Sequence, residues 1–262
     1  MVGTSAALMP LRLLALGDSL TQGVGDPTPG RAGFAGQMEG WVTHLARAVE
    51  RSGRSVEVTN LARAGAQSSH VVDEQVPLMR ATLRRRRVDV ASCIVGVNDL
   101  CRVEFSIERF SHNYGRAVAA LAARSTVVLT ATIHQFDQPF PVPAHVRQRL
   151  HANIDATNAV IRSTGAAHGA LVVDMAASEL IRGDVRSVDR LHPNRYGHQL
   201  IAAEVLATLQ RAGHLCDVPM VAAFPARRGA QDLAHVAWVG GYVHRIVTQR
   251  LRDSRSSQAA DT

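Results

Sequence analysis

Lysine is absent from the 262 residues, so the formal net charge of +7 rests on 29 arginines against 22 acidic residues. Codon bias in a GC-rich genome explains such an absence, and the alternative is a surface that binds nucleic acid or an anionic substrate. The densest basic run, Arg84–Arg87, joins an apolar helix-like stretch to an apolar strand-like stretch. Aromatic residues make up only 4% of the chain and do not interleave with this run. We therefore interpret it as a solvated connection and expect no nucleic-acid partner.

Cysteine is also scarce, because the chain contains only Cys93, Cys101 and Cys216. Three is an odd number, and their spacing matches neither a CxxC motif nor a set of metal ligands, which argues against a disulfide framework and fits a reducing compartment. Cys93 lies in a strand-like apolar run and is expected in the core. Cys101 follows a polar motif, so it is expected near that motif, but no histidine or carboxylate pattern indicates a catalytic thiol.

Long apolar runs are missing as well, since none reaches the roughly 20 residues of a membrane-spanning helix. The apolar stretch Met1–Leu16 is short and is interrupted by Pro10 and Arg12. Cleavage of this stretch as a signal peptide would remove the first expected strand. The sequence thus predicts a soluble, cytoplasmic protein without stable membrane insertion.

Short apolar runs alternate with longer amphipathic ones along most of the chain. Runs of this kind that are apolar on both faces are typical of parallel strands covered by helices. The alternation predicts an α/β fold with a doubly wound parallel sheet. The expected strands are Arg12–Leu16, Ser55–Leu61, Val88–Val95, Thr126–Thr132 and Leu171–Asp174. The expected helices are Met38–Arg51, Val71–Leu83, Ile107–Ala123, Val146–Thr164 and one that starts with Pro193 as a first helical residue and ends near Ala212.

Ser19 stands where the first expected strand stops, in the run Gly17-Asp18-Ser19-Leu20. Ligands of open α/β sheets bind outside the carboxyl ends of the strands, so a serine there is well placed to act as a nucleophile. The same residues also suit an ordinary turn, in which Asp18 bonds only to its own backbone.

A serine nucleophile needs a base, and Asp189-Arg190-Leu191-His192-Pro193 supplies one just before the last expected helix. His192 can accept the serine proton, and Asp189, three residues earlier, can orient the imidazole. Taken singly, His192 can be structural, and Asp189 can be a favourable charge near a helix start.

Two further segments supply hydrogen-bond donors for an oxyanion. Gly96-Val97-Asn98-Asp99 directly follows the third expected strand, and Gly65 follows the second. The Asn98 amide and the backbone N–H groups of Gly65 and Ser19 would surround a tetrahedral intermediate. Asn98-Asp99 alone is also a common turn.

These four segments, in this order, resemble the signature blocks of the SGNH, or GDSL-type, hydrolases, and the resemblance spans about Leu11 to Ala212. It implies a flavodoxin-like three-layer α/β/α sandwich with a five-stranded parallel sheet. It also implies a catalytic set of Ser19, Asp189 and His192, an oxyanion hole of Ser19, Gly65 and Asn98, and no metal or organic cofactor. Arg190 departs from the family pattern, in which a small residue is common at that position.

The resemblance divides the chain into a hydrolase domain over 1–215 and a C-terminal extension over 216–252 with an added amphipathic helix. The tail 253–262 is polar, and we expect it to be disordered. The added helix either packs on the domain or binds a partner.

The leading interpretation is an esterase that cleaves small-molecule esters through an acyl-enzyme on Ser19. The alternatives are an acyltransferase that uses the same acyl-enzyme, or a non-catalytic binding protein. The loops 25–40 and 134–143 follow strand ends, so they are either pocket walls or plain surface loops. Candidate substrate-binding residues are Asp18, Arg102, Phe136 and Phe140, while Phe34 and Trp41 suit an acyl pocket or the core equally. Short acyl esters are the expected substrates, and the oligomeric state is not readable.

Overall fold

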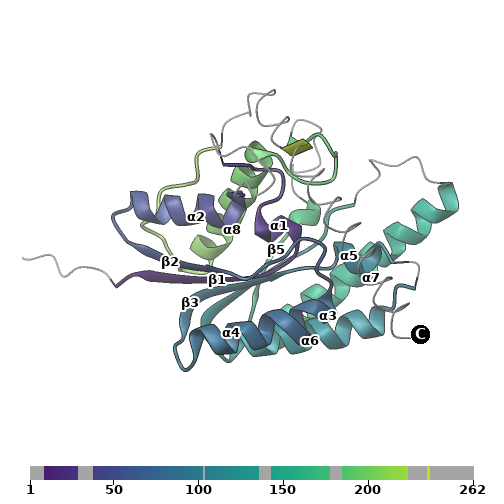
Figure 1. The fold of residues 1–262 in the computed structure, drawn as a ribbon, viewed down its shortest axis with the longest axis horizontal. Coiled ribbons are helices and arrows are strands. Elements are labelled where there is room, and N and C mark those ends of the chain that lie inside the picture. The colour runs from purple at the N-terminus through teal and green to yellow at the C-terminus, as the bar shows by residue number, and fades with distance from the viewer. Residues whose placement is uncertain are drawn as a thin grey trace, which may run out of the picture.

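A computed structural model describes residues 9–28, 38–102, 104–135, 143–177, 185–223 and 235–236. Its centre is a sheet of five parallel strands in the order β2-β1-β3-β4-β5 (Figure 1). The strands are β1 (Leu11–Gly17), β2 (Val56–Asn60), β3 (Val88–Ile94), β4 (Ser125–Ala131) and β5 (Leu171–Val173). The expected α/β fold and its five-stranded parallel sheet are confirmed.

Helices cover both faces of the sheet. Figure 1 shows α2 and α8 on one side and α4 and α6 on the other. The longer helices are α2 (Gly40–Arg51), α4 (Val76–Leu83), α6 (Ile107–Ala122), α7 (Ala144–His168) and α8 (Arg195–Arg211). The short ones are α1 (Ser19–Gln22), α3 (Ser68–His70), α5 (Val97–Leu100), the π-helical segment η1 (Val71–Gln75) and the 3₁₀ turn η2 (Met175–Ala177). Among the described residues, no helix has the length and apolar character needed to cross a membrane.

The alternation of side chains along β1 explains why two helical layers are needed. Leu11, Leu13 and Ala15 pack into the core beneath α2 and α8. Leu14 and Leu16, one position out of phase, pack into the second core with α4, α6 and α7. Because successive strand residues point to opposite faces, a strand that is apolar throughout must be covered twice.

Three details differ from the sequence-based expectations. The edge strand β2 is buried on neither face: Val56 packs only partly against the core beneath α2 and α8, and Val58, which is 43% exposed, belongs to neither core. The expected helix over 71–83 is preceded by α3 and begins with the π-helical segment η1. Pro193 is not the first residue of α8, because Asn194 is the N-cap and its side chain accepts the Gly197 N–H. The proline was a weaker signal than the asparagine beside it.

The carboxyl end of β1 is held by a side chain from the helical layer. Gln75 accepts the Gly17 N–H and donates to the Gly17 carbonyl, both at 2.8 Å. Gly17 has φ of 144°, and a Cβ atom there would overlap the carbonyl oxygen of Ile94 on β3. Only glycine lets the chain leave the sheet in this direction next to β3. The position of the following residues is therefore fixed relative to the sheet edge.

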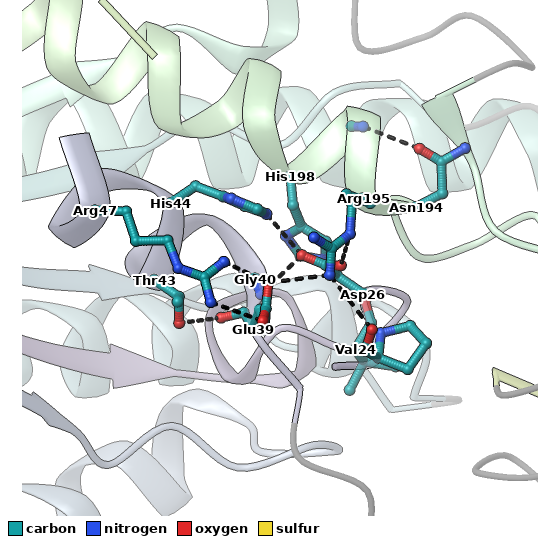
Figure 2. Close-up of polar contacts among 12 residues, drawn as sticks. Val24, Asp26, Glu39, Gly40, Thr43, His44, Arg47, Asn194, Arg195 and His198 are labelled. Carbon is teal, nitrogen blue, oxygen red and sulfur yellow. Dashed lines mark hydrogen bonds and ion pairs between the residues drawn. The ribbon is translucent and has the colours of Figure 1, made fainter. Parts of the chain in front are cut away.

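A buried ionic cluster joins the segment after α1 to the starts of α2 and α8 (Figure 2). Asp26 is fully buried, and its carboxylate contacts His44 Nε2 at 2.7 Å, Arg195 Nε at 3.0 Å and the Gly40 N–H at 3.2 Å. Burial alone would raise the pKa of Asp26, but the His44 hydrogen bond and the Arg195 guanidinium help to outweigh it and lower the pKa. The cluster thus holds an ionised carboxylate between three separate elements.

The remaining members extend this ionic cluster to both helices. Glu39 pairs with Arg47 through two contacts of 2.6 and 2.8 Å and with Arg195 at 3.0 Å. His198 on α8 donates from Nε2 to the Val24 carbonyl at 2.9 Å. Burial lowers the pKa of His198 to about 4, so its ring is neutral at pH 7. The cluster ties the start of α8 to the segment that follows α1.

Asp26→Asn should lower the free energy of unfolding at pH 7 by about 3 kcal/mol, because breaking a buried ion pair leaves uncompensated charge behind. The loss should shrink at low pH, since a carboxylate with a lowered pKa stabilises the fold above its ordinary pKa and not below its folded one. Urea unfolding at several pH values measures this. The exposed change Asp73→Asn is the control and should stay within about 0.5 kcal/mol of wild type. An equally small effect of Asp26→Asn would contradict the role assigned to the cluster.

Candidate active site

Ser19 is the first residue of α1, two positions after the end of β1. Asp18 is the N-cap of α1, and its Oδ1 accepts the Leu20 N–H at 3.0 Å. The tight strand-to-helix turn projects Ser19 from the carboxyl edge of the sheet into a pocket. The expected position of the serine is the observed one.

His192 and Asp189 come from the segment that leads into α8. His192 Nε2 lies 2.8 Å from Ser19 Oγ, and His192 Nδ1 lies 2.7 Å from Asp189 Oδ2. A turn closes this segment, because the Ser187 N–H donates to the His192 carbonyl at 2.8 Å. Arg190 lies within the turn with φ of 57°, in the left-handed region. Hydroxyl, imidazole and carboxylate thus form one hydrogen-bonded chain.

The charge of Asp189 fixes the tautomer of His192. Burial alone would raise the pKa of Asp189, but hydrogen bonds from His192 and His235 outweigh it and hold the pKa well below its usual value. The carboxylate is therefore ionised and can only accept hydrogen bonds. His192 Nδ1 must carry a proton, which leaves Nε2 of a neutral ring with a lone pair toward Ser19 Oγ.

Gly65 and Asn98 line the same pocket as Ser19. The Asn98 side-chain amide donates to the Ala66 carbonyl at 3.0 Å, which fixes the orientation of the amide. Asn98 carries a second N–H on the same nitrogen. Gly65 has φ of 78°, a left-handed conformation that glycine adopts without strain. The structure thus gathers all the residues that the sequence suggested for an oxyanion hole around one pocket.

Asp18 is a buried carboxyl group on the pocket wall, with 4% of its surface exposed. Burial raises the pKa of Asp18 to about 6, against the opposing effects of the Leu20 N–H and of His192. Its contribution to stability is therefore complete below the ordinary pKa of an aspartate and is lost as the pH rises through about 6.

Asp18→Asn should consequently stabilise the protein at pH 8 relative to wild type, by about 2 kcal/mol more than at pH 4. An asparagine oxygen can still accept the Leu20 N–H, so the helix cap is preserved. Chemical unfolding at both pH values gives the difference. Asp217→Asn, at an exposed position, should show no such change between the two pH values. A stability difference that is independent of pH would show that Asp18 is not held in its neutral form by burial.

The pocket has a volume of about 310 Å³ and is largely apolar. Its apolar lining includes Ile94, Ile133, Met175, Val185 and Ile201. His134 and Arg186 also line it, with Arg186 Nη2 3.3 Å from His134 Nε2. Burial and the neighbouring guanidinium lower the pKa of His134 to about 4, so this ring is neutral at pH 7. The site therefore combines a polar rim around Ser19 with an apolar interior.

Several residues suggested by the sequence lie elsewhere. Arg102, just after α5, is exposed and is not among the residues that line the pocket. Trp41 is 2% exposed in the core between α2 and the sheet, so it is not a pocket residue. Cys101 is exposed, and Cys93 is buried as expected. The suggestions at Phe34, Phe136 and Phe140 lie outside the described residues, as do most of the C-terminal extension and the tail.

Sequence reasoning missed the apolar lining and His235. The lining residues come from β3, from loops after β4 and β5, and from α8, so no short motif contains them. His235 Nε2 lies 2.9 Å from Asp189 Oδ2 although 46 residues separate the two. The chain contains 12 histidines, and no motif surrounds His235 to distinguish it from the others.

Two groups of described residues bring three potential metal ligands within 4.8 Å of one another. They are Asp189–His192–His235 and Asp26–Glu39–His44. In the first group Asp189 already accepts hydrogen bonds from both rings. In the second, Arg195 places a guanidinium between the two carboxylates. Both groups are thus explained by hydrogen bonds and ion pairs between their own side chains.

Comparison with solved structures shows the same fold. An enzyme named LAE5, from the metagenome of Lake Arreo, Spain, has a TM-score of 0.58 and 21% identity over 78% of this chain and 97% of its own. The acetylxylan esterase Axe2 from Geobacillus stearothermophilus has a TM-score of 0.58 and 18% identity over 78% and 95% of the two chains. The protein TesA has a TM-score of 0.60 and 20% identity over 76% and 98%.

Comparison with curated protein sequences gave no significant match. A family model, described as the GDSL-like lipase/acylhydrolase family, matches residues 15–200. This match spans Ser19 after β1, the segments after β2 and β3 that carry Gly65 and Asn98, and His192 before α8. The chain therefore belongs to the GDSL-like lipase/acylhydrolase (SGNH) family, as its four sequence blocks predicted.

Proposed function

We propose that the protein is a serine esterase that cleaves carboxylic esters through an acyl-enzyme on Ser19. The observation that carries the proposal is the contact between Ser19 Oγ and His192 Nε2, 2.8 Å apart at the wall of an apolar pocket. A hydroxyl is a weak nucleophile until an adjacent base accepts its proton. Membership in a family of acylhydrolases supports the same chemistry.

In the first half of the reaction, Ser19 Oγ attacks the ester carbonyl carbon while its proton passes to His192 Nε2. Asp189 keeps the resulting imidazolium oriented and stabilises its charge. The tetrahedral intermediate then collapses. The bond to the alcohol oxygen breaks, and that oxygen takes the proton from His192, which leaves the acyl group on Ser19.

In the second half, a water molecule gives a proton to His192 Nε2 and attacks the acyl carbonyl. Collapse of this second intermediate returns the proton to Ser19 Oγ and releases the carboxylic acid. In both halves a carbonyl oxygen becomes an oxyanion. We assign its stabilisation to the backbone N–H groups of Ser19 and Gly65 and to the Asn98 amide, whose orientation is already fixed by Ala66.

The apolar pocket supports an ester whose acyl group is larger than acetyl. A volume of about 310 Å³ lined by Ile94, Ile133 and Met175 exceeds what an acetyl group would fill. Each buried methylene contributes about 0.8 kcal/mol, or about fourfold in kcat/KM, as long as the pocket accommodates it. The acyl specificity therefore depends on how far the chain extends into this pocket.

With p-nitrophenyl esters of increasing acyl length, kcat/KM should rise by about fourfold per methylene from acetyl to butyrate and fall once the pocket is full. Ile201→Phe, which narrows the pocket from α8, should shift the optimum to shorter chains. The change Leu78→Phe, at an exposed position on α4, is the matched control. A preference for acetyl in wild type would contradict the proposed acyl class.

A fluorophosphonate probe tests the proposed chemistry directly, because it phosphonylates only activated serines. Mass spectrometry of the labelled protein should locate the adduct on Ser19. Ser163→Ala, at an exposed position on α7, should be labelled at the wild-type rate. Absence of labelling would favour the non-catalytic alternative, and labelling at another serine would contradict the assignment of Ser19 as the nucleophile. Product analysis with and without an acceptor alcohol distinguishes hydrolysis from acyl transfer.

A further inference from the structure

His235 approaches the Ser19 site from outside the residues that the family model matches. Its ring is fully buried, and its Nε2 lies 2.9 Å from Asp189 Oδ2. The family match ends at residue 200, so this histidine belongs to the C-terminal part of the chain. A buried imidazole from this part of the chain thus contacts the carboxylate that orients His192.

The hydrogen bonds of Asp189 show what His235 does there. Oδ1 accepts the backbone N–H groups of Leu191 and His192, both at 2.9 Å. Oδ2 accepts from His192 Nδ1 at 2.7 Å and from His235 Nε2 at 2.9 Å. Since an ionised carboxylate has no hydrogen to give, both imidazoles must donate to the shared oxygen.

The four donors fix the carboxylate in position. The two backbone N–H groups hold Oδ1 within the turn that carries His192, while His235 holds Oδ2 from a part of the chain 46 residues away. The His192 and His235 rings lie 6.3 Å apart with their planes at 56°, so they meet at the oxygen rather than stack. Rotation of the carboxylate would break the His235 contact.

We propose that His235 is a positioning residue of this site, which holds Asp189 Oδ2 so that His192 keeps its Nε2 directed at Ser19. This inference rests on the esterase chemistry proposed above. Without the His235 donor, Oδ2 would keep only the His192 contact, and the part-buried carboxylate would be held less firmly on the side that faces His192. The C-terminal part of the chain thereby supplies a side chain to the active site.

Two variants of the full-length protein test this inference. His235→Phe keeps a planar ring but removes the donor, whereas His235→Gln keeps an N–H that can reach Oδ2. With p-nitrophenyl butyrate, His235→Phe should lower kcat roughly tenfold with little change in KM, and His235→Gln should restore most of the loss. His168→Phe, at the exposed end of α7, should behave as wild type. His235→Asn, whose side chain is too short to reach Oδ2, replaces the phenylalanine variant if that variant does not fold.

A proton NMR measurement gives a readout that is independent of activity. The low-field resonance of the His192 Nδ1 proton should be protected from solvent exchange in wild type and in His235→Gln, and exchange faster in His235→Phe. Equal kcat values and equal exchange in the two variants would overturn the proposal. If wild type neither hydrolyses esters nor reacts with the fluorophosphonate, the proposed function fails, while the exchange measurement still decides whether His235 holds Asp189.

Discussion

Ser19→Ala is expected to reduce kcat/KM for ester hydrolysis by about 10⁴-fold to 10⁶-fold and to abolish labelling by a fluorophosphonate. The variant loses only the Oγ atom that accepts the acyl group. The donors assigned to the oxyanion hole and the apolar pocket remain, so a small residual rate above the uncatalysed reaction is expected. Steady-state kinetics with p-nitrophenyl butyrate measures the loss.

The fold should survive this change. Asp18 still caps α1 through the Leu20 N–H, and Gln75 still holds the end of β1. The midpoint of urea unfolding should therefore stay near the wild-type value. Ser163→Ala provides the matched serine control and should retain full activity. A Ser19→Ala protein that is folded and still hydrolyses esters at the wild-type rate would rule out the acyl-enzyme mechanism.

Asp189→Asn is expected to lower kcat by about 10⁴-fold, because the amide reverses the tautomer of His192. The Asp189 carboxylate accepts four hydrogen bonds. Two come from backbone N–H groups and two from the rings of His192 and His235. An asparagine has only one acceptor oxygen and must place its NH₂ group against some of these donors. If the NH₂ group faces His192, the ring must carry its proton on Nε2, where it can no longer accept the proton of Ser19.

The labelling rate at Ser19 should fall together with kcat, since both reactions need the same base. Circular dichroism and unfolding should show that the variant remains folded. The control Asp73→Asn, exposed in η1, should keep wild-type kinetics. A loss of less than tenfold in a folded Asp189→Asn protein would show that the carboxylate does not set the tautomer.

The sequence predicted those parts of the fold and site that depend on local patterns. The runs at β1, β3 and β4 are apolar on both faces, so they predicted a sheet covered by helices on both sides. The alternation of strands and helices predicted parallel pairing of the strands. Ser19, Asn98 and His192 each stand directly after a strand or before a helix, which is where parallel topology brings segments to one edge. Short motifs were sufficient for these residues because strand ends and helix starts are defined by neighbouring residues.

Tertiary structure alone decided the features built from distant residues. The volume and lining of the pocket depend on how β3, α8 and the loops after β4 and β5 pack, and no motif encodes that packing. The buried pairing of Asp26 with His44 and Arg195 joins three elements, and its charges are stable only because folding brings them together. The position of His235 beside Asp189 likewise results from tertiary packing. An isolated histidine carries no positional signal until packing brings it to the Asp189 carboxylate, because a hydrogen bond depends on distance in space and not on distance along the chain.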